Sequence, residues 1–314
     1  MRTGRYATLL AVLATVAPAS AGVVCDTLGG LARWNVATAR RFVTRARHDA
    51  TGPVGARIDG AVCTARATLQ ATQLSAPGAG LVATRRSGVG VRFLDARSAD
   101  SPALVNGDVL TGGADVEGAL DDVNGTVDTS GDHPEVAACA KAIAGMTPAS
   151  AALAALPTTR DLGDVIVHAQ GPPVTIDARG GGVFPIRHLT LQDESLVHDA
   201  TGTLTCPGGA GGRLTILANP GDQVVLNVYR LWIGQCSTLI APAGDVVLNV
   251  YGVGRAVRIA AEASLPDVAI LAPDRDVELG GGWTAGGTVL GPFWSRRAIL
   301  SGASIVHATR LACP

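Results

Sequence analysis

The chain has 314 residues, and 47% of them are hydrophobic but only 4% aromatic, so the core must be built from Val, Ile, Leu and Ala. The formal net charge of −1 gives no reason to expect a nucleic acid or an anionic membrane as partner. The 40 Gly and 17 Pro residues indicate a chain that turns often.

The first 21 residues have the three parts of a secretory signal peptide. Arg2 and Arg5 supply positive charge, Ala7–Ala17 is apolar, and Ala19–Ala21 fits a cleavage site with small residues. The apolar run is too short to span a bilayer, and no second apolar tail follows, so we expect no transmembrane segment in the mature chain. We therefore expect an exported protein in the extracellular space or at the cell surface, with the periplasm as the alternative.

Short apolar runs bounded by Gly, Asp and Asn fill the first part of the mature chain, which predicts N-terminal strands over residues 22–132. The clearest runs are Ala56–Val62, Gly80–Ala83, Gly90–Leu94, Leu104–Leu110 and Val123–Val127.

An Ala-rich segment over residues 133–156 is the one predicted helix. Asp132 is the expected cap and Pro134 the first helical residue. Gly145 is expected to interrupt the helix, and Pro148 to begin it again. A single helix among many strands is expected to cover the edge or flank of a sheet.

Strands return from Asp164 onward, and a motif repeats among them. Ile270–Leu279 reads I-L-A-P-D-R-D-V-E-L, and related stretches are Ile216–Leu226 and Leu239–Leu248, with a fainter copy from Val289. Irregular repeats of this kind are typical of stacked β-coils. Gly-rich stretches between the strands lack a following Gly-Lys-Ser/Thr, so we interpret them as coil corners rather than nucleotide loops.

The V-V-L-N-V sequence of Val224–Val228 recurs at Val246–Val250, which predicts that these two strands stack in register. The equivalent Asn227 and Asn249 could form an amide ladder or face solvent, and exposure is favoured. The predicted fold class is all-β: a β-solenoid resembling a right-handed β-helix, with one flanking or capping helix. We expect a single domain over residues 22–314, whose C-terminal coils occupy 157–314.

Six cysteines remain after cleavage, and an even number in an exported chain predicts disulfides. Because neighbouring coils lie side by side, local pairs are favoured, which leaves the last two cysteines for each other. The expected pairs are Cys25–Cys63, Cys206–Cys236 and Cys139–Cys313. No Cys/His spacing indicates zinc, and we expect neither a metal nor a cofactor.

Several stretches together resemble choice-of-anchor A, a family of exported bacterial domains grouped with adhesins. The most specific is Ala269–Gly282, followed by Gly287–Leu290; fainter matches lie at 34–36 and 115–118, and others at Ser150–Pro157 and Val246–Val250. The resemblance implies a β-helix-like fold with an adhesive or surface role and supplies no catalytic residues. The family takes its name from its varied C-terminal anchors, whereas this chain ends at Cys313-Pro314 without a sorting motif.

An enzyme is an alternative, because β-helices also host polysaccharide-degrading activities. The candidate acids are Asp193, Glu194 and Asp199, with His198 between them, and the pair Asp274 and Asp276. Paired acids cleave glycosides at defined separations, whereas acids in a repeated turn are more often structural. We expect no catalytic residues.

The candidate ligand or partner surface is the densest aromatic and cationic cluster, formed by Trp283, Phe293, Trp294, Arg296 and Arg297. If buried, the same cluster would plug the end of the solenoid, and this alternative is favoured. Ice binding would need a regular Thr array, whereas residues 201–205 give one short row.

The sequence thus predicts a secreted or cell-surface structural or adhesive β-solenoid without catalytic activity. The alternative is a carbohydrate-binding or polysaccharide-degrading β-helix protein. The expected partners are extracellular matrix, glycan or another cell-surface component, and not nucleic acid.

Overall fold

The computed structural model describes residues 22–49, 52–94, 104–118, 123–194, 197–198, 204–206, 211–280, 288–307 and 311. The predicted signal peptide lies outside the described residues. Two short helices, α1 (Val23–Leu28) and the 3-10 helix η1 (Gly29–Arg33), precede the first strand.

One 23-stranded sheet winds into a solenoid, and its strands pair in parallel from coil to coil. Its N-terminal strands are β1 (Val36–Arg45), β4 (Arg57–Asp59), β5 (Val62–Thr64), β6 (Ala67–Leu69), β7 (Gln73–Ala83), β8 (Val89–Phe93), β9 (Leu104–Thr111), β10 (Asp115–Glu117), β11 (Val123–Asn124) and β12 (Val127–Asp128). Its C-terminal strands are β13 (Gly163–Val167), β14 (Val174–Asp177), β15 (Gly182–Leu191), β18 (Arg213–Leu217), β19 (Gln223–Ile233), β20 (Thr238–Ile240), β21 (Asp245–Val250), β22 (Val257–Ile259), β23 (Ser264–Leu265), β24 (Val268–Leu279), β25 (Thr288–Leu290), β26 (Phe293–Ser301) and β27 (Ser304–Val306). Two antiparallel hairpins are separate from it: β2 (Arg47–Asp49) with β3 (Gly52–Val54), and β16 (Val197–His198) with β17 (Leu204–Thr205).

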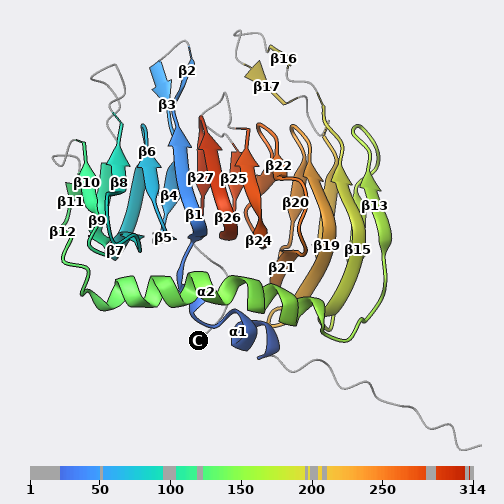
Figure 1. Ribbon diagram of the computed structural model, residues 1–314. Helices are drawn as coiled ribbons and strands as arrows, with labels where there is room; N and C mark the ends of the chain where they lie inside the picture. Colours follow the sequence, from blue (N-terminus) through green and yellow to red (C-terminus); the bar gives the residue numbers. More distant parts are fainter. Residues whose placement is uncertain are drawn as a thin grey trace, which may run out of the picture.

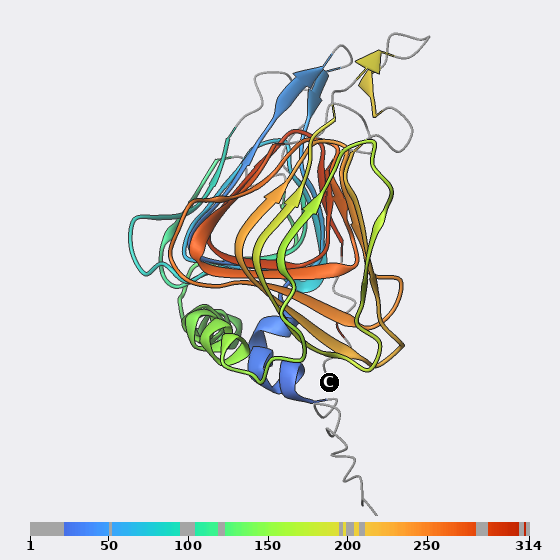
Figure 2. The same ribbon diagram turned by 90° about the vertical axis from the view of Figure 1, so that its right-hand side faces the viewer.

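The coils have a triangular cross-section, so the solenoid presents three faces (Figure 2). The helix face contains β5, β21 and the first parts of β15, β19, β24, β26 and β1. The groove face contains β13, β22, β6, β8, β10 and the second parts of the same long strands. The third face contains β14, β18, β20, β23, β25, β27, β4 and the first parts of β7 and β9. The predicted β-solenoid is confirmed.

The coils are not stacked in sequence order. From β1 the N-terminal coils run to one end, where α2 carries the chain back along the solenoid to β13 (Figure 1). The C-terminal coils then return to the middle, where β26 pairs with β1, and β1 pairs in turn with β5 and β6. The first and last long strands are therefore neighbours.

Helix α2 (Pro134–Ala154) covers the helix face and is continuous, so the predicted interruption at Gly145 is wrong. His133, rather than Asp132, caps it, because its Nδ1 accepts a hydrogen bond from the Glu135 N–H at 3.2 Å. Pro148 lies inside the helix, although proline removes a helical hydrogen bond. Burial of Met146 and Ala149 on the two sides of this position explains why the helix continues.

The length and apolar composition of α2 would suffice to cross a membrane, yet 39% of its apolar window is buried inside the protein. Its inner residues contact side chains that project from the helix face, including Val225 and Val247. We therefore interpret it as a packing helix of the solenoid.

The interior is a stack of aliphatic side chains, as predicted. Val224 pairs with Val246 and Leu226 with Leu248, and all four are fully buried in the interior. Burying one such side chain stabilises the fold by about 1.5–3 kcal/mol. The in-register stacking of the two V-V-L-N-V strands is confirmed.

The favoured exposure of Asn227 and Asn249 is wrong. Both are buried under α2 and form the amide ladder, with Asn249 Nδ2 2.8 Å from Asn227 Oδ1. Asn227 Nδ2 also donates to the Leu153 carbonyl at 3.0 Å, and Asn249 Nδ2 to the Ser150 carbonyl at 2.9 Å. The ladder provides hydrogen-bond partners for carbonyl groups of α2 and for the asparagine side chains of the sheet, which are shielded from water.

The repeat containing Ile270 is out of register with its apparent copies. Ile270 pairs with Leu248, which pairs with Leu226, so it matches the second apolar run of the earlier copies, not the first. The Pro and Asp residues of the motif lie at two different corners. In the copy at Leu239–Leu248 they lie between β20 and β21, whereas in Ile270–Leu279 they lie within β24. The repeated motif correctly indicated stacked coils, but the alignment of its copies does not match the strand register.

Two disulfides join described cysteines, Cys63–Cys139 and Cys206–Cys236. The second pair is confirmed, whereas the predicted Cys25–Cys63 and Cys139–Cys313 pairs are wrong. Cys63 lies on the helix face and is bonded to α2, and Cys25 is disulfide-bonded elsewhere. The expectation that cysteines of neighbouring coils pair with each other fails here, because α2, and not a neighbouring coil, lies over Cys63.

Candidate functional site

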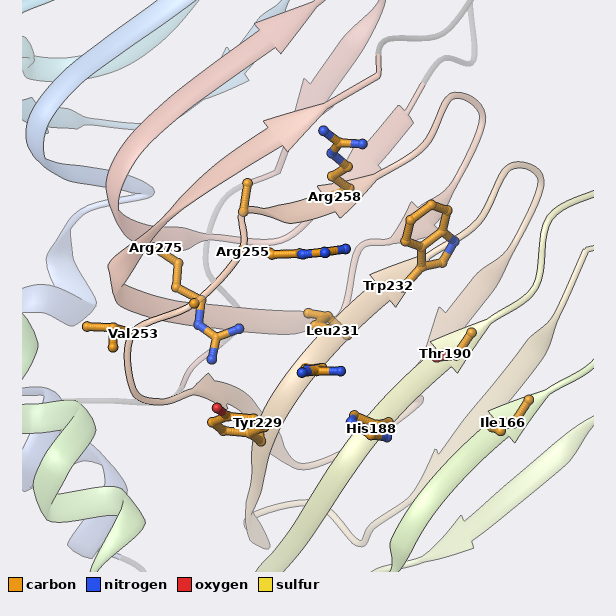
Figure 3. A pocket seen from close by; sticks show the side chains of 13 residues that line it. Ile166, His188, Thr190, Tyr229, Leu231, Trp232, Val253, Arg255, Arg258 and Arg275 are labelled. Atoms are coloured by element: carbon orange, nitrogen blue, oxygen red, sulfur yellow. The ribbon is translucent and has the colours of Figure 1, made fainter.

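The groove face carries a hollow with a cavity volume of about 790 Å³, which we call the arginine–aromatic groove (Figure 3). Side chains from β13, β15, β19, β22 and β24 line it, together with the link from β21 to β22. The lining residues are Ile166, His188, Thr190, Tyr229, Arg230, Leu231, Trp232, Val253, Gly254, Arg255, Ala256, Arg258 and Arg275.

A corner in β19 turns the main aromatic residue of the groove outward. Val228 points into the core, and after the corner Leu231 and Ile233 point inward again. Arg230 and Trp232 therefore face solvent, and Trp232 is 46% exposed. Neighbouring strands place Thr190 and Arg258 on either side of this Trp. An exposed large aromatic ring in a hollow is an unusual feature in an aromatic-poor chain.

The opposite wall is built on Arg275, which is only 3% exposed. Its Nε donates to the Gly252 carbonyl at 2.9 Å and its Nη2 to the Tyr251 carbonyl at 3.0 Å. The guanidinium lies 5.5 Å from the Tyr229 ring centroid, and burial lowers its pKa. These contacts hold one cation rigidly at the groove wall, where little conformational entropy remains to be lost on binding.

The link from β21 to β22 approaches Arg275 closely. A Cβ added to Gly254 would lie 3.0 Å from the Arg275 Cζ, so a larger residue would fit here only if the guanidinium group shifted. The neighbouring Arg255 is exposed and extends toward the hollow in Figure 3. Tyr251 packs near Tyr229, with ring centroids 6.1 Å apart.

The groove is cationic. Arg230, Arg255, Arg258 and Arg275 all line it, and none of the described lining residues is Asp or Glu. Among the described residues, the nearest carboxylates lie beside this lining: Glu278, which lines a neighbouring hollow, is 3.6 Å from Arg258, and Asp164 is 3.1 Å from His188. The hollow therefore combines aromatic surface with donors suited to anionic groups.

A second hollow, with a volume of about 390 Å³, continues the first across the groove face. Trp232 and Arg258 line both hollows, while Ile299 of β26 and Arg45 of β1 line only the second. The two form one trough that crosses the boundary between the C-terminal and N-terminal coils.

The predicted ligand cluster is not assembled at one surface by the described residues. Trp283 lies outside the described residues. Phe293 is fully buried in the solenoid interior, and Trp294 is fully buried on the helix face, where its Nε1 donates to the Trp34 carbonyl at 2.9 Å. The favoured end plug is also not formed, because β26 lies in the middle of the stack.

The two arginines of the predicted cluster reach the outside. Arg296 forms an ion pair with Asp276 at 2.9 Å, and Arg297 lies on the groove face beside Arg41. Arg297 thus lies on the same face as the arginine–aromatic groove but does not line the groove.

The candidate acids Asp193, Asp274 and Asp276 form separate contacts. Asp276 pairs with Arg296, whereas Asp274 Oδ1 accepts a hydrogen bond from Thr147 of α2 at 3.4 Å. Asp193 Oδ1 accepts from the Gln235 N–H at 2.7 Å. Asp199 lies outside the described residues. No group of three His, Cys, Asp or Glu side chains within the described ranges could hold a metal ion.

Comparisons with known proteins give no family: no protein-family model matches the chain, and no curated protein matches. Solved structures of ice-binding proteins are similar in outline. One from the Antarctic ascomycete Antarctomyces psychrotrophicus has 13% identity and a TM-score of 0.34, covering 90% of this chain and 95% of that one. One from an Arctic yeast has 14% identity and a TM-score of 0.44, covering 91% and 95%. With TM-scores below 0.5 these likenesses add no functional assignment.

The third face offers only a short Thr row among the described residues. Thr175 pairs with Thr215, and the next residue in that row is Ile240. Of the predicted row at 201–205, only Thr205 lies within the described residues, on the separate hairpin β16–β17.

Proposed function

We propose that this chain is an exported, non-catalytic β-solenoid that adheres to carbohydrate through the arginine–aromatic groove. The observation that carries the proposal is the exposure of Trp232 and Tyr229, at 46% and 40%, in a hollow on a rigid sheet. An aromatic ring offers a flat apolar surface for a sugar ring, and nearby guanidinium groups donate to its oxygens.

The lining of the groove supports binding rather than cleavage. Glycoside hydrolysis uses a pair of carboxyl groups across the scissile bond. The described groove lining supplies His, Thr, Tyr and Arg side chains instead, which can hold a ligand without activating water. The disulfides Cys63–Cys139 and Cys206–Cys236 support export, because disulfides persist in oxidising compartments.

A polysaccharide-binding assay on the mature chain tests this function. We expect retardation in affinity gels that contain polysaccharide, and loss of most retardation in Trp232→Ala. The matched control is Ile240→Ala, since Ile240 is 39% exposed on the third face, away from the groove. Equal retardation of both variants would move the binding site elsewhere. Release of reducing sugars by the wild-type protein would contradict the non-catalytic assignment.

A further inference from the structure

A cluster of arginines lies on the same face, on and beside strands β26 and β1, which also line the second hollow. Arg297 of β26 is paired directly with Arg41 of β1, and Arg66 precedes β6, the next strand on the groove face. We call Arg41, Arg66 and Arg297 the arginine cluster. Because adjacent strands lie about 4.8 Å apart, the three guanidinium groups project from three successive rungs.

The cluster is not neutralised by the protein. None of its three members forms an ion pair with a carboxylate of the described residues. Arg297 Nε is buried without a hydrogen-bond partner. Burial lowers the pKa of Arg41, and repulsion from Arg297 and Arg66 lowers it further.

Acidic residues on the same face, by contrast, form ion pairs with arginines outside the cluster. Asp276 is bonded to Arg296, Glu278 to Arg258 and Glu117 to Arg92. Within the described residues, the arginines of this face that form no ion pair therefore include the arginine cluster and Arg230, Arg255 and Arg275 of the arginine–aromatic groove, whereas Arg258 is paired with Glu278. Like charges held together destabilise a fold unless an anion joins them, so this arrangement favours an anionic ligand.

We propose that the ligand is a linear acidic polysaccharide that lies along the solenoid axis, from the arginine–aromatic groove to the arginine cluster. The inference rests on the proposed function, because it names the class of carbohydrate that the trough takes. Sugar rings would contact Trp232, while carboxylate or sulfate groups would accept hydrogen bonds from the guanidinium groups at both ends.

The separation of the two cationic regions favours a polymer over a single sugar. Arg230 of β19 and Arg66 next to β6 are separated by five strand spacings along the groove face, through β22, β24, β26 and β1. This corresponds to roughly 24 Å at about 4.8 Å per spacing. A chain of several acidic sugars would cover both cationic regions at once, and binding at one region would favour binding at the other.

The test compares polygalacturonate, dextran sulfate and neutral dextran as ligands of the folded mature chain. We expect binding of an acidic polymer that is at least about tenfold tighter than binding of dextran. It should weaken strongly in roughly 1 M salt, where the Debye length is about 3 Å. Preference for polygalacturonate assigns carboxylate as the recognised group, and preference for dextran sulfate assigns sulfate.

The variant Arg41→Gln with Arg297→Gln is expected to lose about tenfold or more in affinity for the acidic polymer. Its matched control, Arg57→Gln with Arg213→Gln, removes the same charge from the third face and should bind as wild type. The single variant Arg66→Gln, at an exposed position, supplies the same test if the double variant does not fold.

Three outcomes would overturn the inference. Equal affinity for dextran and acidic polymers, sensitive to Trp232→Ala but not to Arg41→Gln with Arg297→Gln, would refute it and leave the proposed function standing. Binding of single-stranded DNA as tight as that of the acidic polysaccharide would show a general polyanion site instead. Absence of binding to all three polysaccharides would refute the proposed function and this inference together.

Discussion

Two asparagine ladders show how the same residue type acquires different roles. Asn227 and Asn249 stack under α2 and are buried, whereas Asn106 and Asn124 stack on the third face, where Asn106 is half-buried and Asn124 is exposed to solvent. The surroundings differ because α2 covers only one face. A buried amide must find partners within the protein, whereas an exposed one can bind water.

Asn249→Ala should therefore destabilise the protein far more than Asn106→Ala. The first removes the side-chain partner of the Ser150 hydroxyl, of the Ser150 carbonyl and of Asn227 Oδ1 at a buried site, which should lower the free energy of unfolding by about 2–4 kcal/mol. The second should cost less than about 0.5 kcal/mol. Thermal unfolding measures both, and equal midpoints would contradict the structural role of the ladder.

Trp232, the main aromatic residue of the groove, was not predicted from the sequence, because a corner in β19 changes which residues face outward. Strict alternation from Val228 would turn Arg230 and Trp232 inward, whereas the corner in β19 adds a residue and reverses the pattern. The renewed apolar pair Leu231 and Ile233 was the available signal. By contrast, the stacking of Val224–Val228 on Val246–Val250 was predictable, because no corner interrupts these stretches.

At the scale of the element, α2 is fixed to the solenoid by both polar and covalent contacts. Cys139 of the helix is bonded to Cys63 of β5, and Arg33 of η1 pairs with Glu135 in the first turn of α2. The existence and flanking position of this helix followed from its composition and from the surrounding strands. Its continuity through Pro148 did not, because packing against the sheet outweighs the local preference.

Replacing Cys63 and Cys139 together by Ser should lower the stability of the protein by about 2–5 kcal/mol, because the bond closes a long loop in the unfolded chain. Hydrogen exchange should rise first in the amides of α2. Cys206→Ser with Cys236→Ser is the comparison, since that bond spans 30 residues rather than 76 and does not reach α2. Unchanged exchange in α2 would contradict its role as a clamp.

At the scale of the whole molecule, the order of the coils was the feature that sequence reasoning missed. It assumed that coils adjacent in sequence are adjacent in space, and so it placed the C-terminal aromatic residues at an end. In the structure β1 lies between β26 and the strands β5 and β6. No local pattern in β1 reveals this, because the information lies in the path taken by α2 across the solenoid.

The junction should control the stability of both halves. Phe42 of β1 is fully buried between Ala298 and Ala67 on the neighbouring strands, and Phe42→Ala should cost about 3–5 kcal/mol. We expect faster hydrogen exchange in β7 and in β24 alike. Phe184→Ala, a similar change near one end, should act mainly on β13, β15 and β19. Exchange that increases only in β1 would contradict a shared junction.

The pairing of β1 with β26 also affects when the protein can fold. Val36 is paired with Phe293, so 293 − 36 = 257 residues of chain separate two strands that lie side by side. The earliest long strand emerges from the ribosome first and completes its pairing last. Such a high contact order slows folding. The delay keeps the two halves from joining until nearly the whole chain is available, and it would leave the chain unfolded during the export proposed above.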